Sequence, residues 1–318
     1  MSVVLFTHPA GLAHNTGEGH PECAERLRCV LRALEAPEFE HLLREQAPRA
    51  TREQLLAVHD SDYVDSLFAL PQDKVTVIDG DTIFGPDTLE AALRSAGAAA
   101  AAVDAVMEGW AQAAFVAMRP PGHHAESDRA MGFCFFNNAA VAARQAQRRW
   151  GLKRVAIVDF DVHHGNGTQY IFAHDPGVMY ASSHQSPCFP GTGMQTEVGV
   201  GNIVNVPLPP GSTGEAFREA WVSCILPRLV EFAPELLVIS AGFDAHASDP
   251  LAQMRLKEPD FAWVTNELLA VADKACPGRV VSLLEGGYDP QALARSCAVH
   301  VRALMRLWFK LSAGTKRT

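Results

Sequence analysis

Two segments of the chain combine histidines with residues that bind metals or carry protons. The first is Pro120–His124, which ends in two adjacent histidines, and the second is Asp159–Gly167, which contains two aspartates and two histidines. Each segment directly follows an apolar run of the kind that forms a buried strand. Because α/β enzymes assemble their sites at the carboxyl ends of parallel strands, these residues predict a catalytic centre, with a metal site as the leading interpretation.

The second segment and a later aspartate could bind one metal ion. In an extended chain, Asp159, Asp161 and His163 stand at alternate positions and project to the same side. Asp244 follows another apolar run, residues 236–240, beyond a glycine turn, and would complete an Asp-His-Asp set. Such a set suits zinc or a similar divalent ion and leaves one coordination position open for water or substrate.

A fourth polar segment, Glu285–Tyr288, follows the apolar run at 280–284. Its two glycines allow the backbone to approach a ligand closely, and the Tyr288 hydroxyl could stabilise a developing oxyanion. Taken singly, an Asp-x-His pair, a His-His pair or a Gly-Gly-Tyr run has an ordinary structural explanation. Their occurrence after several successive strands favours a reaction centre.

Short apolar runs alternate with longer helical stretches along the chain. We expect strands at residues 3–6, 75–78, 114–118, 155–158, 178–181, 203–206, 236–239 and 280–284. We expect helices at residues 88–109, 137–150, 214–232, 259–275 and 290–311. The alanine-rich run at 98–102 is interpreted as helix packed closely on the sheet, not as a linker. The alternation predicts an α/β fold with helices on both faces of a parallel sheet, formed by one domain over residues 1–318.

Composition narrows the class of protein. The chain has 27 Lys and Arg against 36 Asp and Glu, and the net charge of −9 disfavours nucleic-acid binding and is compatible with steering a cationic substrate. No run approaches the roughly 18 apolar residues of a membrane span, and no targeting signal is evident, so we expect a cytoplasmic protein without membrane contact. The seven scattered cysteines include no Cys-x-x-Cys pair and predict reduced thiols.

Together the motifs resemble the zinc-dependent histone deacetylase family, within the arginase-deacetylase fold. The resemblance extends from Gly19–Glu22 to Tyr288 and includes Phe189–Gly193 and Ala241–Asp244. Asn166, where class I members carry an aspartate, makes the chain more similar to the class II and bacterial deacetylase-like amidohydrolases. The resemblance implies an open, mainly parallel eight-stranded sheet flanked by helices.

The resemblance also implies a ligand set and an acid/base pair. Asp161, His163 and Asp244 would hold one zinc ion per chain. The acid/base pair would be His123 and His124, and Tyr288 would stabilise the oxyanion together with zinc.

Each histidine of that pair would have its own partner, Asp159 for His123 and Asn166 for His124. A carboxylate keeps an imidazole cationic more readily than an amide does. We therefore expect His124 to be the general base that later protonates the leaving amine, while His123 acts electrostatically.

Further residues match the family's substrate channel. Gly132, Phe133 and Phe189 would line a narrow passage in which two rings enclose the stem of an acyl-lysine. Without the resemblance, both phenylalanines would be interpreted as core residues. Leu251 matches a rim position where polyamine-selective relatives carry an acidic residue, so it argues against a polyamine preference.

The resemblance implies two potassium sites. The first would use Asp159, the main-chain carbonyls of Asp161, His163 and Ser183, and the Ser182 hydroxyl. The second would lie near Phe172, Asp175 and Val178.

Four other histidines have no chemical role in this scheme. His164 should point away from the metal because of strand alternation. His184 and His246 should lie near the site without an assigned role, and His59 is interpreted as structural.

Three hypotheses follow. The first is a zinc amidohydrolase that removes acetyl or other acyl groups from lysine side chains or related amines, with acetylpolyamines as the alternative substrate. The second is a binuclear manganese hydrolase of the arginase type, for which His123, His124 and Asn166 are poorly suited. The third is a non-catalytic acyl-lysine binding module. The sequence leaves open the native substrate, the acyl length, the oligomeric state and the choice between zinc and iron(II).

Overall fold

The structure, a computed structural model, describes residues 2–306. Its centre is an eight-stranded sheet in the order β2-β1-β5-β10-β9-β6-β7-β8, and every neighbouring pair is parallel. The strands of this sheet are β1 (Val3–Thr7), β2 (Leu43–Gln46), β5 (Ala113–Val116), β6 (Val155–Asp159), β7 (Val178–Gln185), β8 (Ile203–Leu208), β9 (Leu236–Ala241) and β10 (Val280–Leu284). A separate antiparallel pair is formed by β3 (Thr76–Val77) and β4 (Ile83–Phe84).

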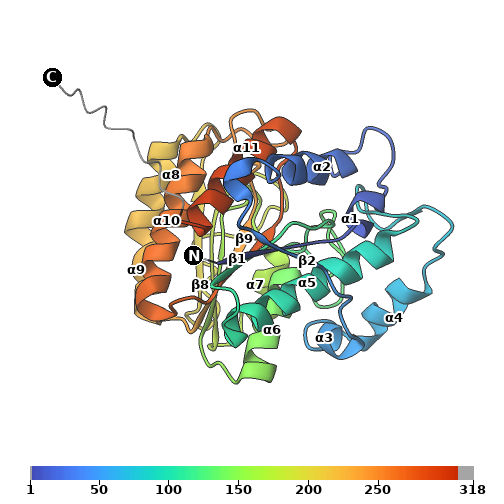
Figure 1. Cartoon of the computed structure of the whole chain (residues 1–318), viewed down its shortest axis with the longest axis horizontal. Helices are drawn as coiled ribbons and strands as arrows, with labels where there is room; N and C mark the ends of the chain where they lie inside the picture. Colours follow the sequence, from blue (N-terminus) through green and yellow to red (C-terminus); the bar gives the residue numbers. More distant parts are fainter. Residues whose placement is uncertain (1, 307–318) are drawn as a thin grey trace.

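Helices cover both faces of the large sheet (Figure 1). One layer contains α2 (Ala24–Ala33), α8 (Gly214–Ala220), α9 (Leu226–Phe232), α10 (Glu258–Ala275) and α11 (Pro290–Leu304). The other contains α5 (Thr88–Glu108) and α6 (Asn138–Trp150), with α3 (Arg52–Leu56) and α4 (Ser61–Ala69) packed beside them. Shorter segments are α1 (Ala10–Ala13), the 3₁₀ turn Pro37–Phe39 and α7 (Asn166–Phe172). The predicted eight-stranded parallel sheet with helices on both faces is confirmed.

Two apolar clusters, one on each face, fix the orientation of the strands. In β6, Val155 and Ile157 pack toward α5 and α6, whereas Ala156 and Val158 pack toward the opposite layer. All four side chains are buried. The strand therefore appears in the sequence as an unbroken apolar run, and a one-residue slip of register would exchange its two faces.

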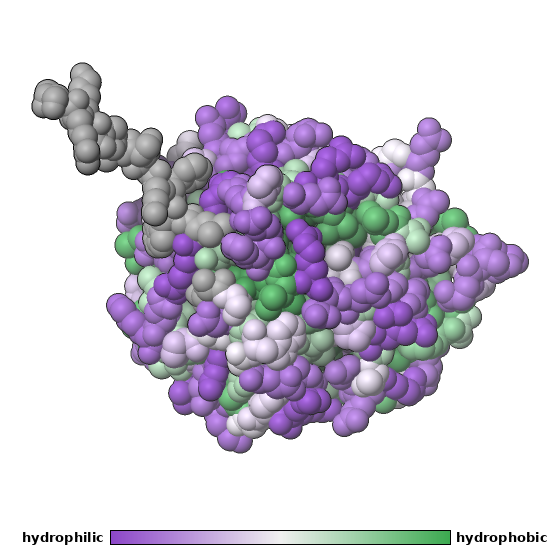
Figure 2. Space-filling view, in the orientation of Figure 1, coloured by the Kyte–Doolittle hydropathy of each residue, from purple (hydrophilic) through white to green (hydrophobic). Residues whose placement is uncertain are grey.

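The molecular surface in this view (Figure 2) is mainly polar. Figure 2 shows hydrophilic residues over most of the surface in view, with smaller hydrophobic areas between them. None of the helices within residues 2–306 is both long and apolar enough to cross a membrane.

Two strand predictions need correction. The run at 75–78 does not join the main sheet, because β3 pairs only with β4 in a small hairpin. The edge strand β2 was not predicted, since its four residues, Leu-Arg-Glu-Gln, are all exposed and show no apolar pattern. It is held by main-chain pairing with β1, and the Arg44 side chain donates to the Leu34 carbonyl at 2.5 Å.

The helix predicted at 214–232 is interrupted. Residues Trp221–Ile225 form a π turn between α8 and α9. Pro227, in the first turn of α9, has no N–H to donate to the preceding turn, and a local widening of the helix accommodates the missing hydrogen bond. Residues 307–311 of the helix predicted at 290–311, and residues 1 and 307–318 of the predicted domain, lie outside the described residues.

The alanine-rich part of α5 lies close to the loop at residues 47–50. The Ala50 N–H donates to the Leu93 carbonyl at 2.8 Å, and a Cβ on Gly97 would lie 2.1 Å from the Pro48 carbonyl oxygen. The absence of a side chain at Gly97 is therefore a packing requirement.

We predict that Gly97→Ala lowers the free energy of unfolding by about 1–3 kcal/mol, because the inserted methyl group must displace backbone. Helix propensity alone predicts the opposite sign, a gain of about 1 kcal/mol. Urea unfolding monitored by circular dichroism measures the change. Gly80→Ala is the matched control, because no atom lies within 4 Å of a Cβ there; a stabilised Gly97→Ala protein would contradict the packing argument.

Candidate metal centre and active site

The predicted site residues follow four strands that are neighbours in the sheet, β5, β10, β9 and β6. Pro120–His124 comes after β5, Glu285–Tyr288 after β10, and Asp244 after β9, while Asp159 is the last residue of β6. Since all four strands are parallel, these segments meet at one edge of the sheet. The sequence prediction that several strand ends converge is confirmed.

Asp161, His163 and Asp244 form a candidate metal site. Among residues 2–306 they are the group whose ligand atoms all lie within 4.8 Å of one another, and all three are buried. His163 Nδ1 lies 3.1 Å from Asp161 Oδ1 and 3.0 Å from Asp244 Oδ2. The other oxygen of each carboxylate is held by the backbone, by Gly286 N–H for Asp161 and by Val162 N–H for Asp244, both at 2.8 Å.

The charge of this group fits a cation. Burial and the negative charge of Asp161 raise the pKa of Asp244 to about 7, so the Asp244 carboxylate is short of compensating positive charge. Both carboxylates pack directly against glycine backbone: a Cβ on Gly242 would lie 2.0 Å from Asp161 Oδ2, and one on Gly286 would lie 2.1 Å from Asp244 Oδ2. Two carboxylates and an imidazole are a donor set that suits a divalent metal.

The two adjacent histidines have different partners. His123 Nδ1 donates to Asp159 Oδ2 at 3.0 Å, and His124 Nδ1 donates to Asn166 Oδ1 at 2.8 Å. Although burial alone would lower the pKa of His123, the negative charges of Asp161 and Asp159 raise it to about 10. Burial, together with the positive charges of His123 and His163, holds the pKa of His124 well below its usual value. One imidazole is thus cationic and its neighbour neutral.

A cavity of about 190 Å³ leads to these groups. Its lining is Asp81, His124, Gly132, Phe133, His163, Phe189, Leu251 and Tyr288, which includes all four residues predicted for the channel. Phe189 and Leu251 are 43% and 38% exposed and stand at the mouth. Gly132 has φ of +55°, and a Cβ there would lie 2.5 Å from His124, so the glycine lets the wall approach the imidazole.

Tyr288 faces this cavity, and Arg26 holds the loop that carries it. The Arg26 guanidinium lies 4.7 Å from the Tyr288 ring centroid and donates to the carbonyls of Glu285 and Gly287, both at 2.6 Å. The Tyr288 N–H donates to Asp249 Oδ2 at 2.7 Å. The tyrosine therefore has a fixed backbone on both sides.

Sequence reasoning missed the groups that hold these loops. Glu285 is buried, and its Oε2 accepts hydrogen bonds from the N–H groups of Gly122 (2.7 Å) and His123 (3.2 Å), while Oε1 accepts from Ser240 (3.1 Å). Arg26, Asp249 and Asp81 were missed as well. The contacts of Arg26 and Asp249 with the loop of Tyr288 join residues at least 39 positions apart in the sequence, so no local spacing indicates them. Only the acidic residue within Glu285–Tyr288 offered a signal.

The four other histidines contact neighbours outside the candidate ligand set, although the buried Nε2 of His246 has no hydrogen-bond partner. His164 turns away from the candidate ligands and contacts Thr192 Oγ1 (2.8 Å) and Gln169 Oε1 (3.0 Å). His184 Nδ1 lies 2.9 Å from Ser182 Oγ, and His246 Nδ1 accepts from Ser248 N–H. His59 bridges two main-chain groups, as a structural residue would.

The predicted second potassium site does not fit this chain. The carbonyls of Phe172, Asp175 and Val178 do converge, but the amide nitrogen of Asn202 lies where they meet, at 2.7, 3.0 and 2.8 Å. The amide donates to the oxygens that a cation would need and occupies its position. The signal was present in the sequence as a polar residue directly before β8.

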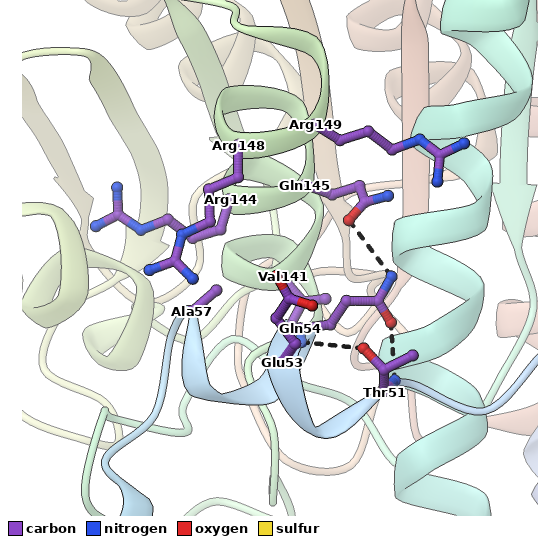
Figure 3. A pocket seen from close by; sticks show the side chains of 9 residues that line it. All are labelled: Thr51, Glu53, Gln54, Ala57, Val141, Arg144, Gln145, Arg148 and Arg149. Carbon is purple, nitrogen blue, oxygen red and sulfur yellow. Dashed lines mark hydrogen bonds between the residues drawn. The ribbon is translucent and has the colours of Figure 1, made fainter.

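A larger hollow of about 350 Å³ lies between α3 and α6 (Figure 3). Three arginines of α6 and polar residues of α3 line it, and Gln54 Nε2 donates to Gln145 Oε1 across it at 3.4 Å. None of the predicted site residues lines this hollow, so we assign the active site to the smaller cavity.

The fold and site define a class: a protein with a parallel α/β sheet and a candidate metal centre at the carboxyl edge of that sheet. A family model described as the histone deacetylase domain matches residues 20–304. The chain belongs to the histone deacetylase family, and it is an enzyme of the kind that hydrolyses acyl-amide bonds.

Relatives and a solved structure agree. The chain is 41% identical over 289 residues to the histone deacetylase-like amidohydrolase of Pseudomonas aeruginosa, covering 89% of this chain and 76% of the relative. It is 38% identical over 307 residues to the polyamine deacetylase HDAC10 of Mus musculus, covering 89% and 45%. The crystal structure of the HDA15 HD domain matches with a TM-score of 0.91 and 35% identity, covering 96% of this chain and 88% of that one.

We predict that Glu285→Leu destabilises the fold by about 2–5 kcal/mol, because it leaves the buried donors of Gly122, His123 and Ser240 without an acceptor. Glu285→Gln keeps one oxygen acceptor and should lose much less. Urea unfolding of both variants measures the difference. Equal midpoints for the leucine and glutamine proteins would show that the carboxylate does not anchor the histidine loop.

Proposed function

We propose that the chain is a zinc-dependent amidohydrolase that removes acetyl or other acyl groups from lysine side chains. The observation that carries this proposal is a single cavity in which His163, His124 and Tyr288 are reached past Phe133 and Phe189. A slender passage with apolar walls accepts an extended methylene stem and delivers its terminal amide to polar groups. Branched or bulky amides would not enter.

Asp161, His163 and Asp244 would hold one zinc ion per chain. When bound, zinc would supply a Lewis acid that polarises the amide carbonyl and makes water more acidic. Catalytic sites of this type use three protein ligands and keep one position open, which agrees with the three donors present.

His124 would act as the general base and then as the acid for the leaving amine. Its Nδ1 donates to Asn166, its Nε2 is the remaining nitrogen, and its pKa is low, so it is neutral and able to accept a proton. His123, kept cationic by Asp161 and by its hydrogen-bond partner Asp159, would stabilise the negative charge that develops on the substrate. The division of labour follows from a carboxylate behind one ring and an amide behind the other.

Tyr288 would donate a hydrogen bond to the carbonyl oxygen as it becomes negative. Burial raises the pKa of the Tyr288 hydroxyl well above its usual value, which keeps the proton available for donation. The loop that carries Tyr288 is held by Arg26 and Asp249, so the donor is preorganised.

A monovalent cation, potassium, is proposed at Asp159, the Ser182 hydroxyl and the carbonyls of Asp161, His163 and Ser183. Asp159 and Ser182 are register partners in β6 and β7, and both side chains are buried. A cytoplasmic location was predicted from the sequence, and it stays a prediction.

The metal proposal predicts one zinc ion per chain after reconstitution and dialysis. Asp161→Asn and Asp244→Asn should each lose tight binding, because an amide is a weaker ligand than a carboxylate. Metal analysis by mass spectrometry measures the ratio, and Asp104→Asn, in α5, is the control. Two manganese ions per chain would contradict the proposal and favour the arginase-type chemistry.

The substrate proposal predicts turnover of acetyl-lysine peptides by the purified, zinc-loaded chain, and slower turnover of acetylpolyamines, since Leu251 offers no charge to a second amine. Tyr288→Phe should lower kcat by roughly 100-fold with little change in KM. Tyr170→Phe, an exposed position, should not. Failure of the wild-type chain on every acyl-lysine tested, or faster turnover of acetylpolyamines, would overturn the substrate assignment.

A further inference from the structure

The Asn166 amide behind His124 is itself oriented by a third residue, Glu126. Asn166 Nδ2 lies 2.8 Å from Glu126 Oε1, 3.2 Å from Met131 Sδ and 3.4 Å from the His124 carbonyl oxygen. All three neighbours are acceptors, so the NH₂ group belongs on that side. The amide oxygen is thereby turned toward His124 Nδ1, at 2.8 Å.

Glu126 is held in place from the main chain and from its own side chain. His59 Nε2 accepts from the Asn137 N–H, so its proton is on Nδ1, which donates to the Glu126 carbonyl at 3.0 Å. The Glu126 N–H donates to the Arg129 carbonyl at 3.0 Å, and its carboxylate pairs with the Arg129 guanidinium at 2.8 Å. The carboxylate therefore reaches Asn166 from a fixed base.

The orientation of this amide decides which nitrogen of His124 carries the proton. A neutral imidazole has one N–H, and an oxygen facing Nδ1 places that proton on Nδ1 and leaves Nε2 with a free lone pair. If the amide turned over, its NH₂ would face Nδ1, and the proton would move to Nε2. His124 would then present a donor, not a base, to the cavity.

We propose that Glu126 is a positioning residue that sets the His124 tautomer through Asn166. Glu126 touches neither the candidate metal ligands nor the cavity of about 190 Å³. Its effect passes through two hydrogen bonds: the Asn166 NH₂ group donates to the Glu126 carboxylate, and His124 Nδ1 donates to the Asn166 oxygen. The catalytic consequence rests on the proposed role of His124 as general base, whereas the tautomer itself does not.

A charge swap tests the proposal. In Glu126→Lys the ammonium group would attract the Asn166 oxygen and turn the amide over, so kcat should fall by about 100-fold or more, the range of a lost general base, with KM little changed. In Asn166→Asp two carboxylates would face each other across the former 2.8 Å contact, and kcat should also fall. The double variant Glu126→Lys/Asn166→Asp places a donor beside an acceptor-only group and should recover to within about tenfold of wild type.

Asp128→Lys is the matched control, because it adds the same charge to an exposed position of the same loop. It should leave kcat within about twofold of wild type, since surface substitutions rarely propagate. Full activity of Glu126→Lys, or a double variant no better than its single parents, would overturn the role of Glu126. A merely structural role would not give rescue by the second substitution.

The ¹⁵N chemical shifts of the His124 ring, assigned by comparison with His124→Gln, report the tautomer without any turnover. We expect the Nδ1–H form in the wild-type protein and the Nε2–H form in Glu126→Lys. The same tautomer in both proteins would overturn the inference and leave the proposed function intact. If the tautomer changes as expected but the chain deacylates no acyl-lysine, the proposed function is wrong and the inference about Glu126 stands.

Discussion

The site depends on one electrostatic constraint, the burial of four carboxyl groups at one edge of the sheet. Asp159, Asp161, Asp244 and Glu285 are each at most 1% exposed. Several kcal/mol per ion are needed to remove such charges from water, so each must be compensated locally. Asp159 has His123 and the Tyr180 hydroxyl, and Glu285 has two backbone N–H groups. Asp161 and Asp244 share the imidazole of His163, and Asp161 also lies 3.8 Å from His123 Nε2. The closeness of two buried carboxylates makes their site attractive to a cation.

The loops around that site are joined by a buried network of ion pairs among Glu22, Arg26 and Arg119. Arg26 of α2 holds the loop of Tyr288, and its charge is offset by Glu22 at 2.8 Å. Glu22 also accepts from Arg119 at 2.6 Å, and Arg119 directly precedes Pro120–His124. Removing one member of such a network leaves an uncompensated buried charge, which costs far more than the net stabilisation of the pair. The tyrosine loop and the histidine loop are therefore positioned together.

The parts of this structure that sequence reasoning found are those with a local pattern. Strands covered on both faces show apolar runs, as β6, β9 and β10 do, and polar residues directly after them mark the site edge. The exposed strand β2 has no such pattern, because its place depends on pairing with β1. The roles of Arg26 and Glu285 depend on contacts more than 160 residues apart in the sequence, which no spacing rule contains.

The pair of adjacent histidines shows how small chemical differences divide a task between similar groups. The two rings lie 4.0 Å apart and share the same buried surroundings, so burial alone would make both neutral. The carboxylates of Asp161 and Asp159 reverse this for His123, whose positive charge in turn lowers the pKa of His124. An amide at position 166 adds no charge that would oppose this effect, whereas a carboxylate there would stabilise a second cation. Burial and the positive charges of His123 and His163 therefore keep the pKa of His124 low, and the two imidazoles differ in protonation.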